Sequence, residues 1–272
     1  MVGIRADEHP PATVVGDHFV EEAAGVVAHR TGLRPALHLE RMVLEGQAFH
    51  PGPRRHGIDA LLAAGTGSGG SPRGTAVAMT VDVCDRASID ALFAGIVERF
   101  GRLDLLFDNA GLFPPSKPID EVTPDEWDAA VRTNQSGMFF VMQQAFRTMK
   151  AQRPQGGRII NNGSLAAFAP RPASVAYTAT KHGVLGLTRA ASLDGRACGI
   201  AVGQIDIGNA ATGMTAHVEQ GALQADGTMR PEVRMDLQHV AAAVVTMARL
   251  PNETSMQSLT ILPTTMPFMG RG

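Results

Sequence analysis

From residue 75 onward, the sequence alternates between short apolar runs and longer segments with helical spacing. The apolar runs that predict strands are 75–83, 103–107, 158–164, 200–207 and 258–262. The segments that predict helices are 89–100, 123–149, 175–197 and 235–250. Strands that alternate regularly with helices in this way form a parallel, doubly wound α/β sheet. Because such sheets bind ligands at the carboxyl ends of their strands, we expect a functional site there.

Composition and charge exclude several classes of partner. The net charge is −2 and no block of lysine and arginine occurs, which argues against a nucleic acid or an anionic membrane as partner. The chain has no run of about 18 apolar residues, so no membrane span is expected. Cys84 and Cys198 are too few for a disulfide framework or a metal site and indicate a reducing compartment. Since the N-terminus lacks the apolar stretch of a signal peptide, we expect a cytoplasmic protein.

The N-terminal part of the chain does not show this regular alternation of strands and helices. Residues 1–24 are polar and contain proline, and we expect a loose arm there. The length of 272 residues suits one domain of the α/β class, which would occupy 25–272 with an atypical beginning at 25–57. The glycine-rich segment 65–70 follows an apparent helix at 58–64 instead of a strand, so we interpret it as a surface loop and not as a phosphate-binding turn.

Two further elements are predicted within the atypical segment. Residues 25–32 could form a first strand and its turn. Pro35 suits a first helical turn, so a helix is predicted at 33–45. The two prolines within 48–55 argue against a central strand at that point.

Three side chains have spacings that suit proton transfer at an oxygen atom. Tyr177 and Lys181 are four residues apart on a predicted helix and therefore share one face. A phenol normally titrates near ~10, and an ammonium one turn away stabilises its ionised form. Ser164 ends a predicted buried strand, and a hydroxyl there could donate a hydrogen bond to a carbonyl oxygen as charge develops on it. The alternative is that Tyr177 only packs on the helix surface.

These residues carry a resemblance to a known family. The Ser-x12-Tyr-x3-Lys pattern and the upstream segment Asp108-Asn109-Ala110-Gly111 resemble the short-chain dehydrogenase/reductase family over residues 75–272. The resemblance implies a Rossmann-like fold and hydride transfer between NAD or NADP and a small-molecule carbonyl or secondary alcohol. It makes Tyr177 the acid/base and Lys181 its electrostatic modulator. It also implies that relatives pair as homodimers or homotetramers through the helices at 124–150 and 175–197.

The resemblance assigns roles to further positions. Ser164 would orient the substrate carbonyl, and Asn134 would hold a water that relays protons to the lysine. The residues expected to contact the cofactor are Gly32, Asp82, Val83, Asn109, Ala110, Gly111, Tyr177, Lys181, Gly208 and Thr212. Residues 209–233 would form a substrate lid, and Phe113 and Phe168 would contribute to a partly apolar pocket. Two structural alternatives stay open: Asp82 could belong to a strand-end turn, and Asn134 could bend or cap its helix.

Some positions depart from the family pattern. Ala36 and His38 stand where two glycines of the phosphate-binding turn are expected, and the His38 ring would obstruct the approach of backbone to phosphate. Asp108 replaces the usual asparagine and adds a charge that could need a partner. Arg54 and Arg55 point to the 2′-phosphate of NADP, since guanidinium groups match phosphate.

These departures motivate two other interpretations. The first is a catalytically impaired or non-catalytic family member with a degraded cofactor-binding turn, which would act as a binding or assembly partner. The second is that two compensating frameshifts in a G+C-rich gene produced residues 33–53. Cofactor binding and resequencing of the gene, respectively, distinguish them from the oxidoreductase hypothesis.

Overall fold

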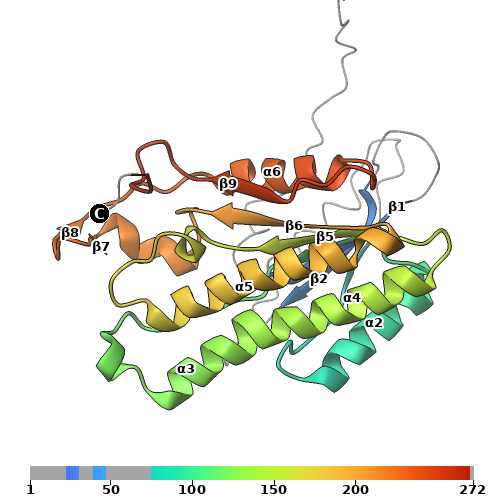
Figure 1. The fold of residues 1–272 in the computed structure, drawn as a ribbon, viewed down its shortest axis with the longest axis horizontal. Helices are drawn as coiled ribbons and strands as arrows, with labels where there is room; N and C mark the ends of the chain where they lie inside the picture. The colour runs from blue at the N-terminus through green and yellow to red at the C-terminus, as the bar shows by residue number, and fades with distance from the viewer. Residues whose placement is uncertain (1–22, 31–38, 47–74, 270–272) are drawn as a thin grey trace, which may run out of the picture.

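The computed structural model describes residues 23–30, 39–46 and 75–269, which form a three-layer α/β fold around one mixed sheet (Figure 1). The order of the seven strands across the sheet is β3-β2-β1-β4-β5-β6-β9. Their bounds are β1 Ala23–Arg30, β2 Leu39–Gly46, β3 Thr75–Ala78, β4 Leu105–Asp108, β5 Gly157–Asn162, β6 Ile200–Ile207 and β9 Ser258–Ile261. The predicted α/β fold class is therefore confirmed.

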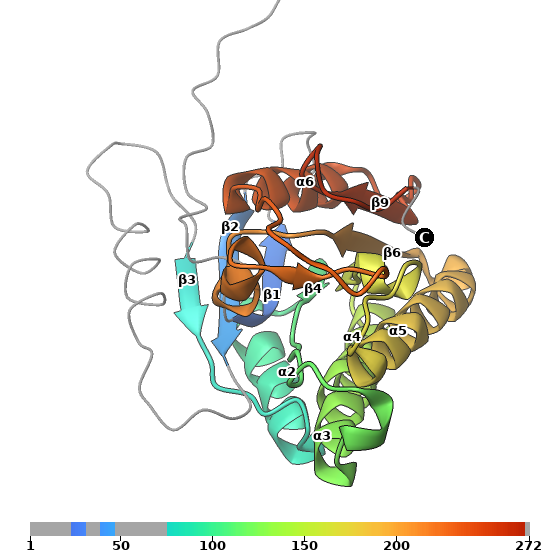
Figure 2. The same ribbon diagram turned by 90° about the vertical axis from the view of Figure 1, so that its left-hand side faces the viewer.

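Helices cover both faces of this sheet. Their bounds are α2 Arg86–Phe100, α3 Pro124–Ala130, α4 Met138–Ala151, α5 Val175–Asp194 and α6 Leu237–Arg249. Figure 2 shows α6 on one face and α2, α4 and α5 on the other. Short elements complete the described chain: the 3-10 turns η1 Ile119–Glu121, η3 Leu165–Ala167, η4 Arg196–Cys198 and η5 Gly213–Glu219, and the two-stranded sheet of β7 Ala222–Leu223 with β8 Met229–Arg230.

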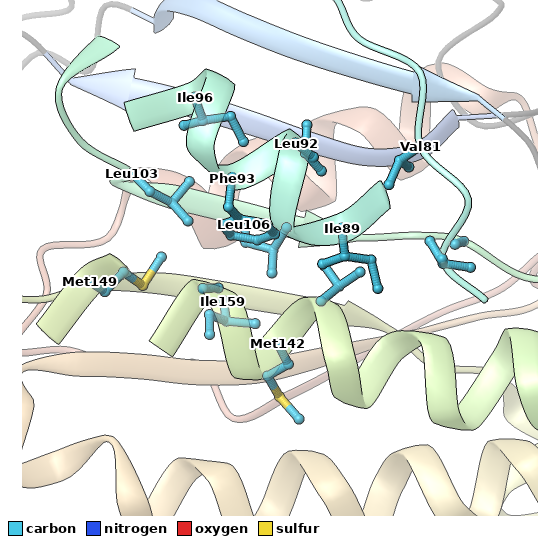
Figure 3. Packing of buried hydrophobic residues seen from close by; sticks show 14 of the residues in the cluster. Val81, Ile89, Leu92, Phe93, Ile96, Leu103, Leu106, Met142, Met149 and Ile159 are labelled. Carbon is cyan, nitrogen blue, oxygen red and sulfur yellow. The ribbon is translucent and has the colours of Figure 1, made fainter. Parts of the chain in front are cut away.

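The core between the sheet and α2 follows from the helical spacing of the sequence. Figure 3 shows the apolar face of α2 against residues of β4, β5 and α4. The buried α2 side chains are Ile89, Leu92, Phe93 and Ile96. Burial of an isoleucine such as Ile96, which is 0% exposed, contributes roughly 1.5–3 kcal/mol. A second cluster of buried side chains lies between the sheet and α6.

The long helix predicted at 123–149 is one continuous helical run with an irregular middle. It begins with the predicted capping box, in which the Thr123 hydroxyl accepts from the Glu126 N–H and the Glu126 carboxylate accepts from the Thr123 N–H. Between α3 and α4 the backbone is π-helical at Val131–Gly137 (η2). Single π-helical turns within an α-helix occur frequently at functional sites.

One strand breaks the parallel pattern. Strands β4, β5, β6 and β9 are parallel neighbours, and so are β2 and β3, but β1 runs antiparallel to both β2 and β4. Only the eight residues 31–38 separate β1 from β2. A parallel connection needs a crossover of a dozen or more residues, whereas an antiparallel pair tolerates a short one. The direction of β1 therefore agrees with the length of its connection.

Three predicted elements differ from the structure. The helix predicted at 33–45 is wrong from residue 39 on, where the chain forms β2. A short apolar run such as that within 39–46 does not distinguish a strand from a helix by its periodicity. The strand predicted at 75–83 ends at Ala78, and the rest of that range leads into a turn, closed by the Asp85 N–H donating to the Asp82 carbonyl, that precedes α2. Strand β1 also begins at Ala23, two residues inside the expected arm.

The rest of the N-terminal predictions lie outside the described residues. These are Gly32, Ala36, His38, Arg54, Arg55, the helix at 58–64, the loop at 65–70 and most of the arm at 1–24. Within the part of the chain that the structure describes, no helix has the length and apolar content needed to span a membrane.

Candidate active site

A cavity of about 650 Å³ opens at the carboxyl ends of β4, β5 and β6. Residues that follow these strands line it: Asn109, Ala110 and Gly111 after β4, Gly163 and Ser164 after β5, and Gly208, Asn209, Ala210 and Thr212 after β6. Because parallel strands end at the same edge of a sheet, segments distant in sequence meet there. The cavity thus lies where the sequence predicted a functional site.

Tyr177 and Lys181 lie one turn apart on α5, and both line the cavity. The Lys181 ammonium lies 5.6 Å from the centre of the Tyr177 ring. The Phe113 ring is tilted against the Tyr177 ring, with 4.7 Å between their centres. An aromatic ring and a cation thus both lie beside the Tyr177 ring in the cavity wall.

Lys181 is almost completely buried, with 3% of its surface exposed. Its ammonium donates to the Asn162 carbonyl at 2.8 Å, which fixes it against the end of β5. Two buried acids lie within its electrostatic reach. Burial raises the pKa of Asp108 well above its usual value, and the charge of Lys181 opposes this shift. Burial also raises the pKa of Asp206, while hydrogen bonds from Gln204 and the Ser164 N–H, together with the Lys181 charge, lower it.

Asp108, which stands where the family usually has asparagine, is buried. It is 0% exposed, and neither carboxylate oxygen has a hydrogen-bond partner among the described residues. It pairs in register with Asn161 of β5, whose side-chain oxygen is likewise buried without a partner there. Two acceptors therefore lie on the same face of neighbouring strands without a donor between them.

Ser164 stands two residues beyond the end of β5 in extended backbone (φ −170°). Its hydroxyl accepts from the Ala166 N–H at 3.2 Å and so begins the η3 turn. Its own backbone N–H donates to Asp206 Oδ1 at 3.0 Å. The structure thus brings Ser164, Tyr177 and Lys181 to one cavity, as the sequence predicted.

Asn134 lies in the π-helical turn η2 and is 0% exposed. Its side-chain oxygen accepts from the Leu112 N–H at 2.8 Å, and its amide donates to the Leu112 carbonyl at 2.9 Å and to Thr180 Oγ1 at 3.2 Å. It therefore ties the loop after Gly111 to α5, beside Lys181. Its part in a proton relay stays a prediction.

Most of the expected cofactor residues line the same cavity: Val83, Asn109, Ala110, Gly111, Tyr177, Lys181, Gly208 and Thr212. Asp82 is not among the lining residues. Its carboxylate accepts from the Cys84 N–H at 2.8 Å, which is the turn geometry of the structural alternative. Contact of Asp82 with adenine stays a prediction, and Gly32 lies outside the described residues.

The expected lid and aromatic pocket are present in part. Phe113 and several residues of 209–233 line the cavity, including Met214, Val218 and Met229. Phe168 is not among the lining residues and has 45% of its surface exposed, so its predicted place in the pocket is wrong. The short η3 turn ends at Ala167, and the ring of the next residue, Phe168, is exposed to solvent.

Sequence reasoning missed an ion pair that joins the lid to the active-site loop. The buried Glu232 carboxylate accepts from Arg171, from Asn209 at 2.8 Å and from Gln224 at 2.9 Å. Arg171 lies between Ser164 and Tyr177 in the chain, and it lines the cavity together with Asn209. No local motif marks this cluster, because its members come from three separate loops.

The sequence was compared with known proteins. The model of the short chain dehydrogenase family matches residues 61–222. A 3beta-hydroxysteroid dehydrogenase of Mediterraneibacter gnavus is 37% identical over 116 residues, which are 43% of this chain and 41% of the relative. A trans-4-hydroxycyclohexanecarboxylate dehydrogenase of Sinomonas cyclohexanicum is 36% identical over 152 residues, which are 56% and 57% of the two chains.

A solved structure of similar fold is a variant of actinorhodin polyketide ketoreductase with NADPH. It has a TM-score of 0.65 and 27% identity, and the match covers 76% of this chain and 81% of that one. The matches to the curated relatives span about half the length of those proteins. The family model nevertheless covers more than half of this chain, and it includes Ser164, Tyr177 and Lys181. The chain belongs to the short chain dehydrogenase family.

Proposed function

We propose that this protein is an NAD(P)-dependent oxidoreductase that transfers hydride between nicotinamide and the carbon of a carbonyl group or secondary alcohol. The observation that carries the proposal is the convergence of Ser164, Tyr177 and Lys181 on one cavity at the carboxyl edge of the sheet. Relatives named as dehydrogenases and reductases support it, as does the similar ketoreductase structure with NADPH.

The described part of the cavity fits the nicotinamide half of such a cofactor. Lys181 has three N–H donors, of which one donates to the Asn162 carbonyl and the other two have no hydrogen-bond acceptor among the described residues. A buried ammonium with donors left over, at the wall of a cavity, suits the hydroxyl groups of a ribose. Asn109, Ala110, Gly111 and Thr212 would hold the rest of this half.

Each residue of the trio has a defined task. When bound, the cofactor supplies or accepts the hydride. Tyr177 donates its hydroxyl proton to the substrate oxygen during reduction and accepts it during oxidation. The charge of Lys181 stabilises the phenolate that remains. Ser164 donates a hydrogen bond to the substrate oxygen as negative charge develops on it, and Asn134 supports the return of the proton from solvent.

Turnover by the Tyr177→Phe variant tests this mechanism. The purified protein is assayed with NADPH and NADH, or their oxidised forms, against a panel that includes trans-4-hydroxycyclohexanecarboxylate and a 3β-hydroxysteroid, alcohols of the kind that relatives are named for. We expect Tyr177→Phe to lose at least about 100-fold in kcat, since acid/base catalysis contributes 10²–10⁴-fold. His182→Ala changes an exposed neighbour on the same helix and serves as the matched control. Full turnover by Tyr177→Phe would contradict the mechanism.

The remaining properties follow from the same proposal. We infer a homodimer or homotetramer that pairs through α4 and α5, a cytoplasmic location for a chain with two free thiols, and a preference for NADP because of Arg54 and Arg55. The alternative of a non-catalytic binding partner has no observation of its own among the described residues. Cofactor binding tests it directly.

A further inference from the structure

Four consecutive residues, Asn161 to Ser164, at and just after the end of β5 each form a hydrogen bond to another segment of the chain. The side chain of Asn161 donates to Thr188 Oγ1 on α5 at 2.9 Å. The Asn162 carbonyl accepts from Lys181 at 2.8 Å, and the Gly163 N–H donates to the Ile205 carbonyl at 2.8 Å. The Ser164 N–H then donates to a side chain, Asp206 on the neighbouring strand β6. This last hydrogen bond ties the serine to the neighbouring strand, whereas the Ala166 N–H that donates to its hydroxyl belongs to the same loop.

Asp206 belongs to a buried polar chain. It is 0% exposed, and its Oδ1 accepts from Gln204 Nε2 at 2.6 Å in addition to the Ser164 N–H at 3.0 Å. Gln204, which is 1% exposed, accepts in turn from Thr188 Oγ1 at 3.0 Å. Thr188 completes the chain to Asn161. The network therefore connects β5, β6 and α5 and restricts the positions of its members, while Asp206 Oδ2 and Asn161 Oδ1 have no hydrogen-bond partner among the described residues.

The backbone of β5 is shaped to admit this carboxylate. A Cβ atom on Gly163 would overlap both Asp206 Oδ1 and Gln204 Nε2. Gly163 has no positive φ, so its freedom of conformation is not what the position requires. The absence of a side chain is what lets the carboxylate approach the peptide that leads into Ser164.

We propose that Asp206 is a positioning residue for Ser164. Its carboxylate holds the Ser164 backbone N–H and thereby sets the place of the serine hydroxyl at the cavity wall. The inference rests on the proposed function, because the serine matters only if a substrate oxygen binds beside it. Asp206 does not itself line the cavity and touches no reacting atom.

The consequences for catalysis are specific. A hydroxyl that stabilises developing charge must lie within hydrogen-bond distance of one oxygen, and misplacement by about 1 Å reduces rates up to roughly 100-fold. Loss of the Asp206 acceptor should therefore lower kcat more than it raises KM. It should change cofactor affinity far less than kcat, because the Asn162 carbonyl, and not Asp206, accepts the hydrogen bond of Lys181.

Variants of Asp206 test the proposal with two readouts. Asp206→Ala removes the acceptor, and Asp206→Asn keeps an acceptor oxygen in the same place. Asp206→Thr introduces a residue that favours strands, but its hydroxyl oxygen is bonded to Cβ and lies too close to the backbone to reach the Ser164 N–H. Circular dichroism and thermal unfolding establish which variants fold. We expect Asp206→Ala and Asp206→Thr to lose about 10- to 100-fold in kcat with the Kd for NADPH within about twofold of wild type, and Asp206→Asn to retain most of the activity.

The second readout does not depend on turnover. Hydrogen exchange of the Ser164 amide should accelerate at least about tenfold in Asp206→Ala or Asp206→Thr and stay near the wild-type rate in Asp206→Asn. Unchanged exchange at Ser164 in a folded variant that lacks the acceptor would overturn the proposal, and so would unchanged kcat. If the wild-type protein shows no turnover on any substrate, the proposed function fails, and the exchange measurement alone decides whether Asp206 holds Ser164.

Discussion

Asp108 gives the protein a buried carboxyl group that is costly to ionise. Asp108→Asn keeps the shape of the side chain, removes the charge and places an N–H₂ donor on the face that carries the orphaned Asn161 oxygen. A buried group left without its partners costs about 1–3 kcal/mol, and more when it is charged. We therefore expect Asp108→Asn to raise the free energy of unfolding by about 1–3 kcal/mol at about pH 7.5. The Lys181 charge offsets part of the penalty in the wild-type protein.

The pH dependence of this gain follows from the raised pKa of Asp108. Below the unfolded pKa the carboxyl is protonated in both states, so ionisation has no effect on stability. As pH rises above the unfolded pKa, the unfolded state loses its proton first, and the folded state is destabilised by about 1.4 kcal/mol per pH unit until the raised folded pKa is reached. The advantage of Asp108→Asn should thus be largest near neutral pH and shrink toward about pH 4.

Urea unfolding at a series of pH values, at one protein concentration, measures both quantities. Asp128→Asn removes the same charge from an exposed position on α3, and its stability should stay within about 0.5 kcal/mol of wild type. A variant Asp108→Asn that is less stable than wild type at neutral pH would refute the reasoning. A difference that does not vary with pH would refute it as well.

Three further changes test other parts of the structure. Glu232→Gln removes the charge that pairs with Arg171, and we expect a KM increased about tenfold together with faster limited proteolysis within 213–233. Arg158→Met removes the side chain that donates to the carbonyls of Leu250, Pro251 and Thr254, and it should lower the free energy of unfolding by about 2–4 kcal/mol in urea. Thr123→Ala removes one half of the capping box and should cost about 1 kcal/mol in the same assay, whereas an unchanged midpoint would show that the cap contributes nothing.

The sequence predicted best those elements whose signals are local. Strand β6 occupies the predicted range at Ile200–Ile207, and α5 begins at the predicted Val175. The capping box at Thr123 was also predicted, since its two partners are three residues apart. The Tyr177–Lys181 pair was found for the same reason, because a spacing of four residues fixes a shared helix face.

The features that were missed depend on distant parts of the chain. The antiparallel direction of β1 depends on pairing with β2 and β4, which local periodicity does not report. From the sequence alone, Asp206 can be recognised only as an acidic residue within an apolar strand. Its partner Gln204 lies on the same strand, but Ser164 follows β5, and this contact is visible only when β5 and β6 are placed side by side.

Titration of the purified protein with NADPH and NADH, followed by fluorescence, tests the central claim most directly. If the cavity holds a nicotinamide cofactor, one of the two should bind with a Kd on the order of micromolar, and tighter binding of NADPH would support the role assigned to Arg54 and Arg55. Lys181→Met, which removes the ammonium at the cavity wall, should weaken that binding. If neither cofactor binds at about millimolar concentration, the site does not hold the cofactor that the proposed reaction requires, and the account of this protein as an oxidoreductase is contradicted.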